Sequence, residues 1–229
     1  MPQATFEGES FEAGEGLERK RARGVEVCRR LDERYGPVEC FLEHDTPYHL
    51  VISVLLSAQT TDAQVNKVTP ELFGRWPTPE ALAQADVHEV EDVIHALGFY
   101  RTKAAHAVAA AQMIVADFGG EVPHTMDELC RLPGVGRKTA NIVLNVGFGQ
   151  VEGIAVDTHV RRIAHRLDLS APEHERDALQ TEQDLLRLLP RELWGPVNHQ
   201  WILHGRETCS ARAPRCDGCL LADLCPSRR

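Results

Sequence analysis

Four cysteines near one end of the 229-residue chain have the spacing of a metal or cluster site. They form the pattern Cys-x6-Cys-x2-Cys-x5-Cys within 17 residues. A structural zinc site usually pairs two short Cys-x2–4-Cys knuckles, and only one pair here has that spacing. Uneven spacing within a single loop is more typical of a cubane iron–sulfur cluster. We therefore expect a 4Fe–4S cluster, with zinc as the alternative, on Cys209, Cys216, Cys219 and Cys225.

A glycine-rich turn precedes these cysteines by about 70 residues, in the sequence LPGVGRKTA at positions 132–140. Gly134 and Gly136 permit positive φ and close approach of the backbone, so the turn can present amide groups at the start of the next helix. Arg137 adds positive charge to this anion site. The sequence also resembles a phosphate-binding P-loop, but the residue directly before the lysine is Arg137 rather than glycine, and no strand precedes the turn. We expect a helix–hairpin–helix that binds a DNA phosphate.

Two further residues could carry covalent chemistry. Lys138 lies in the first turn of the helix after the hairpin, where the helix dipole disfavours a protonated amine. It is therefore a candidate nucleophile for Schiff-base formation. Asp157 follows the apolar run 154–156 at an expected helix start. Its position suits an N-cap and a catalytic carboxylate equally well.

Helices are expected to position these groups, because alternating strand patterns are nearly absent. Thr46-Pro47 and Thr78-Pro79 are helix starts, with proline at the first helical position after a threonine cap. Pro70 is expected to kink or end the helix that follows Asp62. Only Gly153–Val156 resembles a strand. Other predicted helices cover residues 101–118, about 126–132 and 137–146, and two or three more lie between 157 and 207, which gives an all-α chain of about ten helices.

The composition is that of an ordinary globular protein, with 43% hydrophobic and 26% charged residues. The net charge of −9 is unusual for a nucleic-acid binder, but five glutamates and no basic residue lie in the first 18 positions. The stretch 129–151 has three basic residues and no acid, so DNA binding stays open. The sequence shows no signal pattern or membrane span, and we expect a bacterial-type cytoplasmic protein near the nucleoid. Outside the cluster, Cys28, Cys40 and Cys130 are predicted to be buried thiols on apolar helix faces.

Five ordered motifs resemble the endonuclease III family, which are bifunctional DNA glycosylase/AP lyases of the helix–hairpin–helix superfamily. The resemblance extends over residues 19–226. It rests on LLSAQTTD at 55–62, the hairpin region at 132–145, VDTH at 156–159, WILHGR at 201–206 and the four-cysteine loop.

The resemblance implies two helical domains with a DNA cleft between them. Residues 40–150 would form a six-helix barrel with the helix–hairpin–helix. Residues 19–39 and 151–229 would form the iron–sulfur cluster domain, after an acidic flexible tail at 1–18. The partner would be double-stranded DNA that carries a damaged base or an abasic site, bound by a monomer.

The resemblance also implies roles for individual residues. Lys138 would attack C1′ of an oxidised pyrimidine nucleotide, expel the base and form an imine, and β-elimination would cut 3′ to the lesion. Asp157 would assist deprotonation and stabilise the developing sugar cation. Gln59 would fill the space opposite the orphan base, and Phe99 would be a wedge in the other strand. Arg212 and Arg215 of the cluster loop would meet phosphates.

This chain departs from the family pattern at its wedge, which is aromatic where an aliphatic residue is common. Arg101 and Ala213 also replace a smaller polar residue and a lysine that are frequent in the family. One alternative function is a monofunctional mismatch glycosylase, although adenine-removing relatives usually lack the lysine and have a glutamate within the stretch 54–57. The other is a non-catalytic DNA-binding cluster protein. A small-molecule enzyme built on the apparent P-loop is the least favoured reading.

Overall fold

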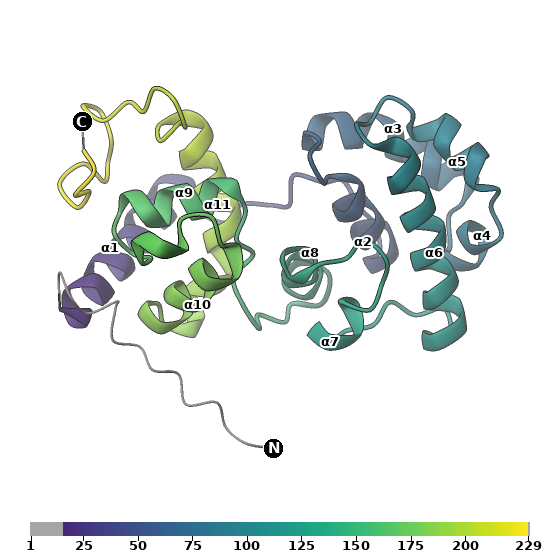
Figure 1. The fold of residues 1–229 in the computed structure, drawn as a ribbon, viewed down its shortest axis with the longest axis horizontal. Coiled ribbons are helices and arrows are strands. Elements are labelled where there is room, and N and C mark those ends of the chain that lie inside the picture. Colours follow the sequence, from purple (N-terminus) through teal and green to yellow (C-terminus); the bar gives the residue numbers. More distant parts are fainter. Residues whose placement is uncertain (1–15, 229) are drawn as a thin grey trace, which may run out of the picture. The chain divides into compact units, whose positions relative to one another are not determined.

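The computed structural model describes residues 16–228, and within this range every regular element is a helix (Figure 1). The all-α prediction is confirmed. Gly153–Val156, the expected strand, is instead a buried segment without regular structure. Most of the predicted acidic tail lies outside the described residues. The elements are α1 (Leu17–Tyr35), α2 (Pro47–Leu56), α3 (Asp62–Arg75), α4 (Pro79–Ala83), α5 (Val87–Ile94), α6 (Tyr100–Phe118), α7 (Met126–Leu129), α8 (Arg137–Ile142), η1 (Val143–Gly147), α9 (Thr158–Arg166), η2 (Pro172–His174), α10 (Ala178–Leu188), η3 (Arg191–Leu193) and α11 (Trp194–Glu207).

The chain divides into two compact units. Unit 2 is continuous, runs from Cys40 to Glu152, and contains α2 to α8 with η1. Unit 1 combines the segment that ends at Glu39 with the segment that begins at Gly153, so α1 packs with α10 and α11, which also pack with α9. The glycine hairpin belongs to unit 2, whereas the VDTH segment and the cysteine loop belong to unit 1.

Unit 2 is organised around α2, whose residues from Leu50 to Leu56 are all buried. A helix that is apolar on all sides must be surrounded by other helices, and α2 contacts α3, α6, α8 and η1. Its start is the predicted one, because the Thr46 hydroxyl accepts a hydrogen bond from the His49 amide at 3.1 Å. Thr78 caps α4 in the same way. These local signals specify where the helices begin.

In unit 2, the helix after Asp62 does not end at Pro70, and the helix predicted for 137–146 is not a single α-helix. The helix after Asp62 continues through Pro70 to Arg75, because Pro70 lies on the exposed side, where water can satisfy the carbonyl group that loses its partner. The helix predicted for 137–146 consists of α8 and a π-helical turn, η1. In that turn, a Cβ on Gly147 would lie 3.2 Å from Leu50, so glycine allows η1 to approach α2 closely.

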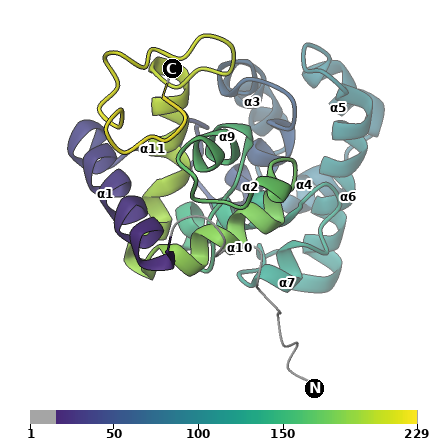
Figure 2. The ribbon, with the colours of Figure 1, turned by 60° about the vertical axis from the view of Figure 1, so that its left-hand side comes forward.

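Unit 1 has its own core, in which the fully buried Trp201 of α11 packs with apolar residues of α1 and α9. Figures 1 and 2 show α1 beside α11, and the cysteine loop follows the end of α11. Lys20 of α1 forms a salt bridge of 3.0 Å with Asp168, which directly follows the last turn of α9. This salt bridge connects the two sequence segments that make up unit 1.

The three cysteines outside the loop do not share one environment. Cys28 is buried on α1 as predicted, and burial raises the pKa of its thiol to about 12. Cys40 is half-buried and lies in a loop rather than on a helix. Cys130 is exposed, so its predicted burial was wrong. The helix before it has only four residues, too few to establish an apolar face.

No helix between residues 16 and 228 combines the length and the apolar character that crossing a bilayer requires.

Candidate active site and cysteine cavity

The glycine hairpin joins α7 to α8, and its two glycines, Gly134 and Gly136, lie in different environments. Gly134 has φ +80°, and a Cβ there would lie 2.9 Å from Nδ1 of His106 and 3.1 Å from Leu55. Both the backbone conformation and the close packing therefore demand glycine. Gly136 has φ −100°, so it does not use the positive φ that glycine permits. It is the exposed N-cap of α8 with no atom near its missing Cβ, which leaves space for a ligand to approach the backbone.

Lys138 is the second residue of α8 and its side chain is exposed. Within the described residues, no hydrogen bond or salt bridge holds its amine. The neighbouring Arg137 is half-buried. The Lys138 amine is therefore accessible. It lies in the first turn of α8, beside backbone amides that have no hydrogen-bond partner within the helix.

Asp157 is the N-cap of α9, so the structural interpretation of this residue is confirmed. Its Oδ1 accepts hydrogen bonds from the amides of His159 and Val160, both at 2.8 Å. The segment before it is buried, and the Asn198 side chain donates a hydrogen bond of 2.6 Å to the carbonyl oxygen of Ala155. One carboxylate oxygen therefore holds the helix start, and Oδ2 accepts no hydrogen bond from residues 16–228. The cap role leaves an oxygen available for chemistry.

Gln59 and Phe99 are both exposed and both have left-handed backbone conformations, with φ of 54° and 57°. Gln59 lies in the turn between α2 and α3, and Phe99 is the residue before α6. Phe99 is 67% exposed, which is exceptional among the phenylalanines between residues 16 and 228. The exposure of the Phe99 ring therefore means that packing of the ring within unit 2 does not explain its left-handed backbone.

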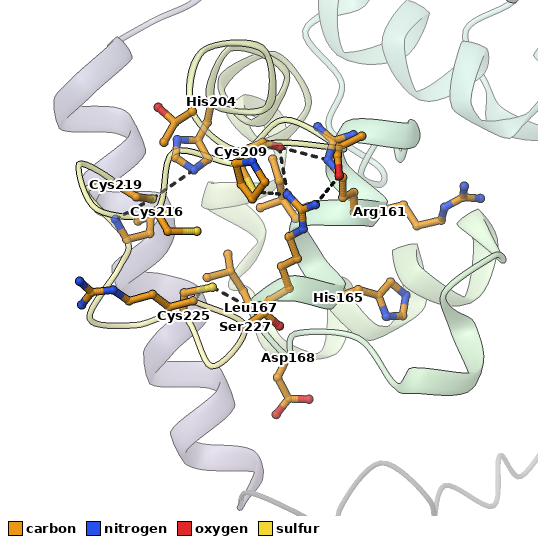
Figure 3. A pocket seen from close by; sticks show the side chains of 18 of the residues that line it. Arg161, His165, Leu167, Asp168, His204, Cys209, Cys216, Cys219, Cys225 and Ser227 are labelled. Atoms are coloured by element: carbon orange, nitrogen blue, oxygen red, sulfur yellow. Dashed lines mark hydrogen bonds between the residues drawn. The ribbon is translucent and has the colours of Figure 1, made fainter.

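The four cysteines of the loop line one cavity of about 680 Å³ within unit 1. Figure 3 shows their side chains gathered at one end of this cavity, with Arg161 and His165 of α9 away from them. Among the described residues, no three His, Cys, Asp or Glu side chains are arranged to hold a single metal ion. Burial raises the pKa of Cys219 and of Cys225, so both thiols are protonated near neutral pH. A metal ion that binds them must displace these protons.

Two arginines from outside the loop hold it in place. Arg166 of α9 donates hydrogen bonds to the Cys209 sulfur at 3.1 Å and to the carbonyl oxygens of Ser210 and Ala211 at 2.8 and 2.9 Å. Arg30 of α1 donates to both carboxylate oxygens of Asp223, at 2.6 and 2.9 Å, and to a loop carbonyl group. Sequence reasoning missed both residues, since nothing in their spacing shows that they face the loop.

A sulfur that receives a guanidinium N–H is suited to carry negative charge, as a thiolate ligand does. The backbone amide of Leu221 similarly donates to the Cys219 sulfur at 3.4 Å. His204 also lies 3.8 Å from that sulfur, and burial lowers the pKa of its imidazole to about 4, so the ring is neutral near pH 7. The surroundings of Cys209 and Cys219 therefore fit an anionic metal–thiolate group.

Arg212 and Arg215 are exposed on the same loop. The Arg215 amide donates a hydrogen bond of 2.9 Å to the carbonyl oxygen of Thr208, which closes the loop at its base. Both side chains are thus carried by a segment that hydrogen bonds from Arg166 and from the Arg215 amide hold.

Comparisons with known proteins agree on one family. Residues 52–191 match the HhH-GPD superfamily of base excision DNA repair proteins. Endonuclease III of Synechocystis sp. is 46% identical over 208 residues, which cover 91% of this chain and 94% of the relative. Endonuclease III of Escherichia coli is 40% identical over 205 residues, which cover 90% and 95%. This chain belongs to the endonuclease III family.

Solved structures lead to the same family. A trapped endonuclease III–DNA covalent intermediate, an estranged-adenine complex, is 40% identical with a TM-score of 0.85, covering 90% of this chain and 96% of that one. A thermostable thymine-DNA glycosylase at 22% identity and a TM-score of 0.79 shares the fold. As a member of the endonuclease III family, the chain is a base-excision repair enzyme, a DNA glycosylase and AP lyase.

Proposed function

We propose that Lys138 is the nucleophile of this glycosylase/lyase. Schiff-base chemistry on a sugar needs a primary amine, and the chain contains only four lysines. Lys20 and Lys103 are buried, at 4% and 5% exposure, and Lys67 lies on the exposed side of α3. Lys138 alone combines exposure with a place at the DNA-binding hairpin. This is the observation that carries the assignment.

The proposed reaction has two stages. The Lys138 amine attacks C1′, the bond from C1′ to the base breaks, and the base leaves with the electron pair and takes up a proton. The amine loses a proton and the ring oxygen leaves C1′ as a hydroxyl group, which gives the imine. A proton then leaves C2′ and the C3′–O bond breaks, so that the strand is cut 3′ to the lesion. Water finally releases the lysine.

Asp157 serves both stages through the carboxylate oxygen that does not cap α9. A carboxylate next to C1′ stabilises positive charge that develops on the sugar as the base leaves. It also accepts the proton that the attacking amine must lose. The hydrogen bonds to Oδ1 hold the side chain in one orientation, which keeps Oδ2 directed away from the helix.

DNA binding would combine phosphate contacts with two inserted side chains. The amides at Gly134 and Gly136, with Arg137, bind a phosphate at the hairpin, and Arg212 with Arg215 binds phosphates at the cysteine loop. Gln59 occupies the space that the flipped nucleotide leaves, and Phe99 enters beside the orphan base. The substrate is double-stranded DNA bound by a monomer in the bacterial cytoplasm, at the nucleoid.

We also propose that the four loop cysteines hold a 4Fe–4S cluster. When bound, this group would order the loop rather than perform hydrolysis. Four thiols around a cavity, with a guanidinium donor directed at the Cys209 sulfur and an amide donor at the Cys219 sulfur, suit a polynuclear group with net negative charge. Anaerobically expressed protein should be brown, with broad absorbance near the visible–ultraviolet boundary and four irons per chain by analysis. A colourless preparation with stoichiometric zinc would exclude the cluster.

Borohydride trapping on a duplex with one abasic site tests the catalytic proposal. Wild type and Lys67→Ala should form a covalent adduct and cut the strand, because Lys67→Ala removes the other exposed lysine. Lys138→Ala should bind the same duplex but give no adduct. On this abasic duplex, neither a binding-only protein nor a monofunctional glycosylase would give an adduct from cluster-loaded wild type. Base release from a duplex that carries an oxidised pyrimidine would then distinguish the two, because only the glycosylase releases the base. An adduct from Lys138→Ala would refute the assignment.

A further inference from the structure

Both residues proposed to enter the duplex have backbones that require external support. A left-handed conformation at a residue other than glycine is energetically unfavourable and persists only where the surroundings impose it. In the described part of the chain, the residues of this kind are Gln59, Phe99 and Asp168. The Phe99 ring is too exposed to supply that support itself.

The support comes from a contact between the two segments. A Cβ on Gly98 would lie 4.0 Å from the carbonyl oxygen of Gln59, so the two backbones are neighbours. The Lys103 amine donates a hydrogen bond of 2.6 Å to the hydroxyl oxygen of Thr60, the residue after Gln59. The Lys103 amide donates to the carbonyl oxygen of Phe99 at 3.1 Å. Lys103 of α6 thus contacts the side chain of the residue after Gln59 and the backbone of Phe99.

The burial of Lys103 is otherwise unfavourable. Its residue is 5% exposed, and burial lowers the pKa of its amine. No carboxylate among residues 16–228 pairs with it, whereas the equally buried Lys20 pairs with Asp168. Removing an amine from water without an ionic partner costs free energy that a methionine of similar length would avoid. A stability role does not account for lysine at this position.

We propose that Lys103 is a positioning residue that holds Gln59 and Phe99 in a fixed arrangement, so that both side chains enter the duplex together. This inference rests on the proposed function, in which these two residues occupy the opened base pair. Without the Lys103–Thr60 hydrogen bond, each left-handed backbone relaxes independently. Steps that require opening of the duplex then become slower, and imine formation on an already accessible sugar does not.

The test compares Lys103→Met and Thr60→Val with Thr60→Ser, which keeps the hydroxyl group. Lys20→Met is the matched control, because it removes an equally buried lysine and the same charge in unit 1. The rate of borohydride trapping is measured on a single-stranded abasic oligonucleotide and on a duplex whose abasic site faces 2-aminopurine. Fluorescence of that base reports its unstacking. Melting temperatures confirm folding of each variant.

Lys103→Met and Thr60→Val should lower the duplex-to-single-strand ratio of trapping rates at least tenfold and reduce the fluorescence rise. Thr60→Ser and Lys20→Met should keep both. An unchanged ratio, or equal losses on both substrates, would overturn the inference; if Lys103→Met does not fold, Thr60→Val decides. A wild type that gives neither adduct nor fluorescence would refute the proposed function itself, and the inference with it.

Discussion

Replacing Asp157 can separate its role as a helix cap from its proposed role in catalysis. Its Oδ1 accepts two amide hydrogen bonds at 2.8 Å, and its Oδ2 accepts none from the described residues. In Asp157→Asn, the amide oxygen can replace Oδ1 as the acceptor, because asparagine and aspartate are about equally good caps. The substitution removes the negative charge while keeping the shape. Asp157→Ala removes the charge and the cap together.

The expected effects on stability are small and different. Loss of the charge at a helix N-terminus costs about 0.5 kcal/mol, and loss of the cap costs about 1 kcal/mol more. For a chain of this size, 1 kcal/mol shifts the melting temperature by roughly 2–4 °C. Asp157→Asn should therefore melt about 1–2 °C below wild type, and Asp157→Ala about 3–6 °C below.

Activity should not follow stability. A group that transfers protons in the transition state contributes about 100-fold to 10,000-fold in rate, so both variants should cut abasic DNA at least about 100 times more slowly than wild type. Calorimetry and single-turnover strand cleavage at 25 °C measure the two effects. An Asp157→Asn protein with cleavage within about tenfold of wild type would show that Asp157 acts as a cap only. Equal melting temperatures of the two variants would refute the cap argument.

Two further predictions concern DNA contacts. Gly134→Ala should lower the melting temperature by several degrees, because alanine at φ +80° is strained and its Cβ would meet His106 at 2.9 Å. Gly136→Ala should lower the melting temperature less, because its only cost is that alanine is a poorer N-cap, but it should bind abasic DNA more weakly, since only a bound phosphate would meet its Cβ. Normal binding would remove Gly136 from the interface. Replacing Arg212 and Arg215 together by alanine should reduce the slope of log affinity against log salt by about 2, and an unchanged slope would exclude both from phosphate contact.

Local interactions made much of this protein predictable. Thr46, Thr78 and Asp157 cap helices through hydrogen bonds that span two or three residues, so the sequence around each is sufficient to place the helix start. The cysteine spacing and the ordered motifs likewise identify the family. Both are properties of residue type and order along the chain, so they can be recognised without knowing how the helices pack. The catalytic, DNA-binding and cluster assignments remain predictions until the experiments above are done.

Packing between distant segments decided what the sequence did not show. Pro70 was compatible with a continuous helix only because it faces solvent, and Cys130 is exposed because α7 is too short to bury it. Lys103 had no recognisable motif, and its contact with Thr60 joins residues 43 positions apart.

The sequence alone determined an all-α protein of the endonuclease III type, with its helix starts, its hairpin and its four-cysteine loop. These features depend on residue types and short spacings, which act through bonds between near neighbours. Only the tertiary structure distinguished Gly134 from Gly136 and brought Arg166 and Arg30 to the cysteine loop. Backbone conformation in a turn, and the partner that a long side chain meets, depend on the surfaces that distant helices bring together.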